Sequence, residues 1–136
     1  MEHPSADLKA RTKSFALRII PVVRSLPRSP EAHVIGRQLL RSGLSAAANY
    51  RAVCRARSRP EFLAKLAIVI EEADETAFWL ELLVDAGLLP EIRLKDLRSE
   101  ANQLVAIFNA SRTTAKRGSH STINNQKSTI PDERAS

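Results

Sequence analysis

The sequence predicts an all-α protein, an antiparallel up-down-up-down four-helix bundle with a disordered C-terminal tail. Ala, Leu, Arg and Glu dominate its 136 residues, and all four favour helices. It has only 4 glycines and no alternating run of Val, Ile and Thr, so nothing in it indicates a sheet. Short links between amphipathic segments favour antiparallel neighbours. We expect a bundle domain over residues 1–113 and a basic tail over 114–136.

The first predicted helix runs from about Asp7, a plausible N-cap, to Leu26. Its apolar residues recur at spacings of three and four, which is typical of one buried helix face. Pro21 interrupts the pattern, and we expect it to kink or shorten the helix. The apolar stripe consists of Leu8, Phe15, Ile19, Val22, Val23 and Leu26.

The second predicted helix runs from Pro30 to about Ala56, a length of about 40 Å at 1.5 Å per residue. Ser29 can cap it, Pro30 suits its first position, and Glu31 favours its positive end. Its apolar positions are Ile35, Leu39, Leu40, Leu44, Ala47 and Val53.

The third predicted helix begins at a capping box, in which Ser58 caps and Glu61 reaches back. It ends near Asp85 and Ala86, with Gly87 as the stop. A continuous apolar ridge indicates that this helix is more buried than the others. The ridge consists of Phe62, Leu66, Ile70, Ala73, Ala77 and Leu80.

The fourth predicted helix starts after Pro90 and ends near Arg112. From about Thr114 the composition is polar, low in apolar residues and without helical periodicity, which predicts disorder. The apolar set of this helix is Ile92, Leu94, Leu97, Leu104, Val105, Ile107 and Phe108.

The second and third helices carry opposite charge. Residues 31–59 contain six arginines and one acid, a net +5, whereas residues 61–85 contain seven acids and one lysine, a net −6. Two such helices joined by a tight turn should fold back on each other as a hairpin. Residues roughly equidistant from the turn then meet, so arginine should lie opposite glutamate in ion pairs.

Polar residues at helical spacing on the facing sides of this hairpin form a candidate inter-helix network. In one interpretation they only fix the register of the two helices. In a sharper one, the carboxylates neutralise some arginines and leave Arg51, Arg55, Arg57 and Arg59 free for phosphate contacts. The candidate network consists of Arg41, Ser45, Asn49, Glu71, Glu72, Glu75 and Trp79.

No residue pattern predicts an enzyme, a metal site or a cofactor. Cys54 lies between arginines but has no histidine placed to act as its base, so a structural thiol is the better interpretation. The acids of the third helix lack the Glu-x-x-His motifs of di-iron bundles. Tyr50 and Trp79 could stack on bases, but core or interface aromatics are the commoner case. The three histidines, His3, His33 and His120, are expected at the surface.

The overall charge and the termini suggest a cytoplasmic protein. The net charge is +6, which permits binding to nucleic acid without proving it. The start of the chain lacks the apolar region of a secretory signal, and no apolar run reaches the ~20 residues of a membrane span. A single cysteine fits a reducing compartment.

Several motifs resemble those of the small bacterial four helix bundle proteins, also called 23S rRNA intervening-sequence proteins, over about residues 8–112. The second helix resembles the subgroup with Asn-Tyr-Arg-Ala, where many relatives carry Asn-Ile-Ala-Glu-Gly. The motifs are Gln38-Leu39-x-Arg41-Ser42-x-x-Ser45, Ala48-Asn49-Tyr50-Arg51-Ala52, Arg55-Ala56-x-Ser58-x-x-Glu61-Phe62-x-x-Lys65-Leu66, Glu71-Glu72-Ala73-Asp74-Glu75 and Phe78-Trp79-Leu80-Glu81-Leu82-Leu83.

The resemblance implies a fold more than an activity. Relatives are antiparallel bundles that assemble into rings, typically pentamers, and a distant relative is the nucleic-acid-binding accessory protein of diversity-generating retroelements, which also binds a reverse transcriptase. We therefore expect a non-enzymatic homo-oligomer that binds RNA, DNA or an RNA–protein complex through its arginines. The alternative is a ring-forming scaffold that docks a protein partner and binds no nucleic acid.

Overall fold

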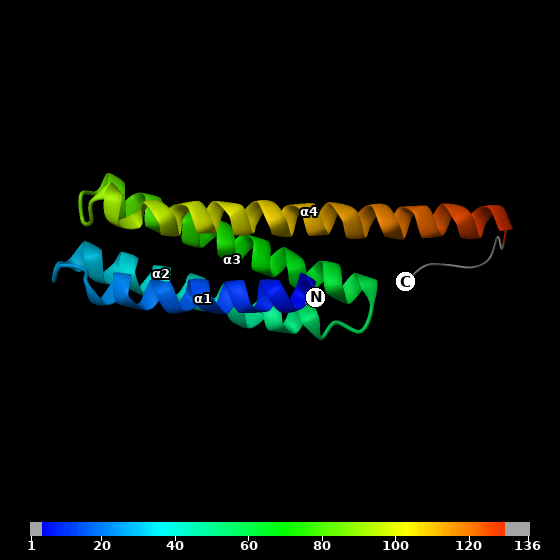
Figure 1. The fold of residues 1–136 in the computed structure, drawn as a ribbon, viewed down its shortest axis with the longest axis horizontal. Helices are drawn as coiled ribbons and strands as arrows, with labels where there is room; N and C mark the ends of the chain where they lie inside the picture. Colours follow the sequence, from blue (N-terminus) through cyan, green and yellow to red (C-terminus); the bar gives the residue numbers. More distant parts are fainter. Residues whose placement is uncertain (1–3, 130–136) are drawn as a thin grey trace.

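The computed structural model describes the backbone of residues 4–129 and the side chains of residues 7–118. Within these residues it contains four helices and no strand, as the sequence predicts. The helices alternate in direction, so the predicted antiparallel bundle is confirmed (Figure 1). The helices are α1 (Pro4–Arg24), α2 (Pro30–Cys54), α3 (Arg59–Asp85) and α4 (Glu91–Thr129).

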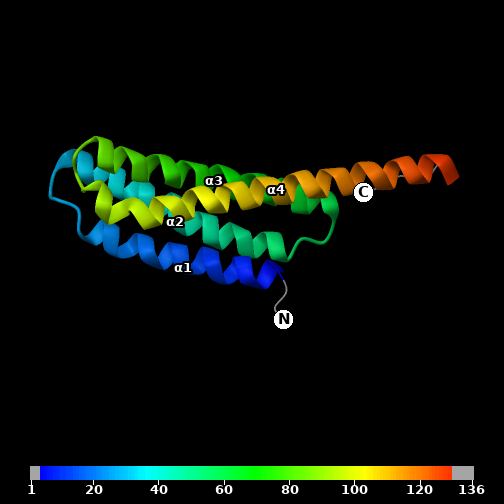
Figure 2. The ribbon, with the colours of Figure 1, turned by 45° about the horizontal axis from the view of Figure 1, so that its top comes forward.

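Packing follows the order of the chain. α2 packs most extensively against α3, α3 against α4 and α1 against α2, whereas α1 makes few contacts with α4. Figure 2 shows the four rods lying side by side, with α4 extending past the turn between α2 and α3. The α2–α3 hairpin predicted from opposite charge is therefore the best-packed pair of the bundle.

The predicted helix caps are present. Ser29 and Ser58 each have an extended backbone and accept a hydrogen bond at their side-chain oxygen, from the N–H of Ala32 and of Glu61, both at 3.2 Å. The Glu61 carboxylate reaches back to the Arg57 N–H at 2.9 Å. The two serine bonds satisfy backbone donors that the first helical turn leaves without partners, and the Glu61 bond holds the residue just before the cap of α3.

Gly87 ends α3 as predicted. Its φ of +74° is left-handed, a conformation that glycine adopts without steric cost. The Leu88 N–H donates to the Leu83 carbonyl at 3.0 Å, and the Gly87 N–H donates to the Val84 carbonyl at 3.0 Å. This pair of bonds is a Schellman motif, which turns the chain sharply toward α4.

Two boundaries differ in α1. The helix begins at Pro4, so Asp7 lies in the first turn and is not the N-cap. It ends at Arg24, two residues before the predicted Leu26 and three after Pro21. Pro21 is exposed, so the helix places its interrupted hydrogen bond toward water and away from the core.

The end of α4 is the main correction to the predicted boundaries. We expected the helix to end near Arg112, but it continues to Thr129. No proline occurs between Pro90 and Pro131, and Gly118 alone costs only about 1 kcal/mol. Polar residues without apolar periodicity therefore extend a helix that the bundle has already started. The last part of the predicted tail, 130–136, lies outside the described residues.

The core is mainly aliphatic, and three aromatic side chains, Phe15, Tyr50 and Phe108, are buried in it. Phe15 and Phe108 are 1% and 0% exposed, and α3 contributes buried residues along its whole length. The Tyr50 and Phe108 rings stack at 5.4 Å between centroids. Tyr50 is therefore a core aromatic, and burial raises the pKa of its hydroxyl above the ordinary value, with a further contribution from Cys54.

Candidate nucleic-acid interface

Arg41 of α2 is held by two glutamates of α3. Its Nη1 donates to Glu72 Oε1 at 3.1 Å, its Nη2 pairs with Glu75 Oε2, and its Nε donates to Gln38 Oε1 at 3.0 Å. Trp79 Nε1 donates to the same Glu75 oxygen at 3.0 Å. One guanidinium thus meets two carboxylates across the hairpin, which is the contact expected from the charge pattern.

This arrangement shifts the pKa of its members in the directions that favour the charged pair. The Trp79 indole and then the Arg41 guanidinium lower the pKa of Glu75, because both donate hydrogen bonds to its carboxylate. The hydrogen bond to Glu75 raises the pKa of Arg41. Since the Arg41 side chain is 46% exposed, the pair fixes helix register more than it stabilises the fold.

The other three members of the predicted network lie apart from this cluster. Asn49 Nδ2 donates to the backbone carbonyl of Ser45 at 2.9 Å, a bond within α2. Glu71 is exposed on α3, and the structure gives it no ion pair with any side chain among residues 7–118. The structure therefore joins Arg41, Glu72, Glu75 and Trp79 only.

A buried hydroxyl pair, which the sequence analysis missed, lies beneath this cluster. Ser42 and Thr76 are both 0% exposed, and their oxygens lie 2.8 Å apart across α2 and α3. Thr76 Oγ1 also lies 2.7 Å from the Glu72 carbonyl. Both residues occupy positions of the apolar pattern of their helices, beside Leu39 and Leu80. A hydroxyl residue at such a position is the sequence signal that could have predicted this pair.

A second neutralised arginine, also missed, joins α1 to α4. Arg11 donates from Nη2 to Glu100 Oε1 at 2.7 Å and from Nε to Glu100 Oε2 at 3.1 Å. This two-bond geometry is the strong form of an arginine–carboxylate pair. Its hydrogen bonds to Glu100 raise the pKa of Arg11.

Three of the four arginines proposed for phosphate contact line one groove. The groove has a volume of about 530 Å³ and lies between the end of α2 and the start of α3. Arg59 is not part of its lining, because its guanidinium lies against α4 at Gly118, where an added Cβ would be 3.2 Å from Nη1. The lining consists of Ala48, Arg51, Ala52, Arg55, Arg57, Glu61 and Lys65.

An adjoining hollow of about 570 Å³ continues the lining onto α1. Ala48 and Arg51 line both spaces, so the two form one surface, which we call the basic groove. Alanines and cations make up all of its lining except Glu61. The hollow on the α1 side is lined by Lys9, Ala10, Lys13, Ala47, Ala48 and Arg51.

The cations of the basic groove lack strong internal partners. Within the described side chains, Arg51, Arg55 and Arg57 have no ion pair, in contrast to Arg11 and Arg41. The only acid of the lining, Glu61, caps α3 and lies 3.9 Å from the Lys65 amine. The groove therefore presents uncompensated positive charge to solvent.

The same part of the chain offers little for other chemistry. No cluster of three His, Cys, Asp or Glu that could hold a metal occurs among the residues described. Cys54 is half-buried and lies beside Tyr50. None of the helices in the described chain is long and apolar enough to cross a membrane.

The fold and its surface define a small antiparallel helical bundle with an open basic groove. The family model described as "23S rRNA-intervening sequence protein" matches residues 6–110, and the chain belongs to that family. A comparison with curated proteins finds no match.

Among solved structures, the chain is similar to a protein with unknown function from the S23 ribosomal protein family of Bacteroides thetaiotaomicron VPI-5482. The two are 29% identical, with a TM-score of 0.74 over 80% of this chain and 97% of that chain.

Proposed function

We propose that the protein is a homo-oligomeric, non-enzymatic bundle that binds structured RNA through the basic groove. The observation that carries this proposal is the contrast between paired and unpaired arginines. Glutamates neutralise Arg11 and Arg41, whereas Arg51, Arg55 and Arg57 line a groove that contains a single acid. Phosphate contacts by arginine supply most of the affinity of non-specific nucleic-acid binding. A family described by a ribosomal RNA insertion favours RNA as the ligand.

The test replaces Arg51, Arg55 and Arg57 together with alanine and measures RNA binding over a range of salt concentrations. All three side chains are exposed, so the helices should keep their fold. The slope of log affinity against log salt should fall by about 2 to 3, since each lost phosphate contact removes about 0.7–0.9.

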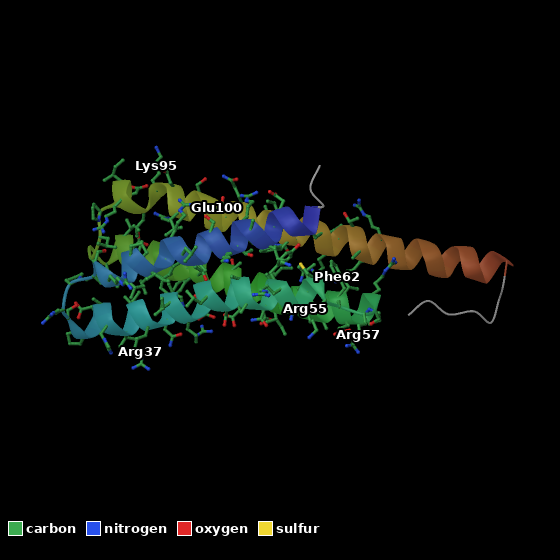
Figure 3. The ribbon with its side chains drawn as sticks, turned by 60° about the horizontal axis from the view of Figure 1, so that its bottom comes forward. Arg37, Arg55, Arg57, Phe62, Lys95 and Glu100 are labelled. Carbon is green, nitrogen blue, oxygen red and sulfur yellow. The ribbon has the colours of Figure 1, made fainter. Side chains whose placement is uncertain are left out.

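The matched control removes the same charge elsewhere, by changing Arg93, Lys95 and Arg98 of α4 to alanine. Figure 3 shows Lys95 on α4, away from Arg55 and Arg57. Equal loss in both variants would mean that only net charge matters, and unchanged binding in the groove variant would refute the proposal. In that case the scaffold alternative, a ring that docks a protein partner, becomes the better hypothesis.

Self-association is the second part of the proposal, and apolar side chains at the surface support it. Phe78 is 50% exposed and Ile68 is 45% exposed, both on the acidic helix α3. Exposed apolar residues on an acidic helix suit a contact with a basic helix of another copy. Light scattering of the protein and of a Phe78→Asp variant tests this: a monomeric wild type would refute it, and a ring of five is the expected size.

A further inference from the structure

A second group of arginines, which we call the turn cluster, lies at the opposite end of α2 from the basic groove. Arg24, Arg28 and Arg37, together with His33, surround a hollow of about 570 Å³ where α1 turns into α2. No carboxylate lines this hollow. Among the described side chains, none of the three arginines forms an ion pair. The turn cluster is thus uncompensated in the same way as the basic groove.

The two clusters lie on one face of the bundle. Arg37 and Arg55 are eighteen residues apart on α2 and its C-cap, which is five turns of about 3.6 residues. Their side chains therefore leave the helix in the same direction, separated by about 27 Å along its axis. Figure 3 shows Arg37 near one end of α2 and Arg55 and Arg57 near the other. α1 borders both hollows, through Arg24 at one end and Lys13 at the other.

The part of α2 between the two clusters carries almost no uncompensated charge. Arg41 is held by the glutamates of α3, and Leu44 beyond it is apolar and 38% exposed. Next come the alanines that line the basic groove. A ligand laid along this face would therefore meet concentrated positive charge at two places and a weakly charged surface between them.

Aromatic platforms are missing from this face as far as the side chains are described. Phe15, Tyr50 and Phe108 are buried, and Phe62 packs partly against the core. Phe78 and Trp79 contact each other on α3, beside acidic residues. Proteins that bind single strands commonly stack bases on exposed aromatics, whereas duplex RNA is recognised mainly by shape and by its phosphates and 2′-hydroxyls.

From these observations we infer that the α1–α2 face binds one RNA duplex lengthwise, with the basic groove and the turn cluster each contacting its phosphates. The inference rests on the proposed function and adds a second contact site and a ligand class to it. At about 3 Å per base pair, the two clusters span about nine base pairs. A duplex of that length is therefore the shortest that reaches both.

The experiment measures fluorescence anisotropy of three probes: a 16-bp RNA duplex, a 6-bp RNA stem closed by a short loop, and an unstructured 16-nucleotide RNA. The wild type should bind the long duplex at least about tenfold more tightly than either other probe. Changing Arg24, Arg28 and Arg37 to alanine should weaken binding to the long duplex about tenfold or more and lower its salt slope by about 2 to 3. Binding to the 6-bp stem should change much less, because a stem of that length reaches one cluster at a time and the basic groove remains.

Three results separate this inference from the proposed function. Undiminished long-duplex binding by the turn-cluster variant, or equal affinity for the single strand, would overturn the inference and leave groove binding intact. Failure of the wild type to bind any probe would overturn both. The variant of Arg93, Lys95 and Arg98 is again the charge-matched control. Circular dichroism checks the fold, and the single change Arg37→Glu repeats the test if the triple variant does not fold.

Discussion

Replacing Thr76 with valine should destabilise the bundle by about 2 kcal/mol, because it removes one half of the buried hydroxyl pair. Valine keeps the branched shape of threonine, so the packing of α3 is preserved. Ser42 Oγ would lose its partner at 2.8 Å and keep only a contact of 3.4 Å to the Leu39 carbonyl. A buried hydroxyl left without a good partner costs about 1–3 kcal/mol.

The double variant Ser42→Ala with Thr76→Val should be more stable than the sum of the single changes implies, by at least about 1 kcal/mol. With both hydroxyls gone, no polar group remains unsatisfied at the contact. Urea denaturation, followed by circular dichroism at one fixed protein concentration, measures all the variants. With a typical slope of about 2 kcal/mol per molar urea, Thr76→Val should lower the midpoint by about 1 M.

Thr114→Val provides the matched control, since it makes the same chemical change at an exposed position of α4. Its effect should stay within about 0.5 kcal/mol. Equal losses in the Thr76 and Thr114 variants, or strictly additive effects of the Ser42 and Thr76 changes, would refute the argument from the buried pair.

Three further predictions concern the glycines and the Arg41 cluster. Gly43→Ala should destabilise, by up to about 2 kcal/mol, because its Cβ would lie 3.0 Å from Ile19 in the core. Gly36→Ala should be neutral or stabilising, because its Cβ would meet the movable end of Leu26 and make an ordinary contact of 3.4 Å with Val23. Thermal melts of both variants compare them. Gly87→Ala should cost about 1–2 kcal/mol from its φ of +74° alone, since nothing lies within 4 Å, and Gly87→Asn should cost less; denaturant midpoints rank the two. Because the pKa of Glu75 is lowered in the fold, Glu75 contributes to stability fully above its unfolded pKa of about 4.3, and this contribution is lost as pH falls through the folded pKa. The free energy of unfolding of Glu75→Gln should therefore fall less steeply with acid than that of the wild type. Parallel curves of stability against pH would contradict this.

Much of the fold could be predicted from the sequence because local signals agree with the packing. Ser29, Ser58 and Gly87 mark helix ends by their own chemistry, and the structure uses all three as expected. The end of α4 could not be predicted in this way. Polar composition indicates what cannot be buried, but a polar segment continues as a helix when nothing such as a proline stops it.

The candidate site was predicted less completely, for reasons of geometry. Opposite charge placed Arg41 against Glu72 and Glu75, but helical spacing alone could not tell which neighbouring residues face the partner helix. Ser45 and Asn49 turned out to bond within α2, and Ser42 makes the contact across the hairpin. The basic groove depends on side chains from three helices, so Lys9, Lys13 and Lys65 could be added to the arginines only once the helices were placed.

The packing of each helix mainly on its neighbours in the chain has a consequence for how the protein forms. Contacts that are close in sequence close short loops, and bundles of this kind fold rapidly. α2 and α3 can pair as soon as both have left the ribosome, and α4 can then add to a surface that is already ordered. The docking of α1 on α4, with Arg11 meeting Glu100, is the one step that must join the two ends of the bundle. Because α1 and α4 share few contacts, we expect the folded bundle to open first between these two helices.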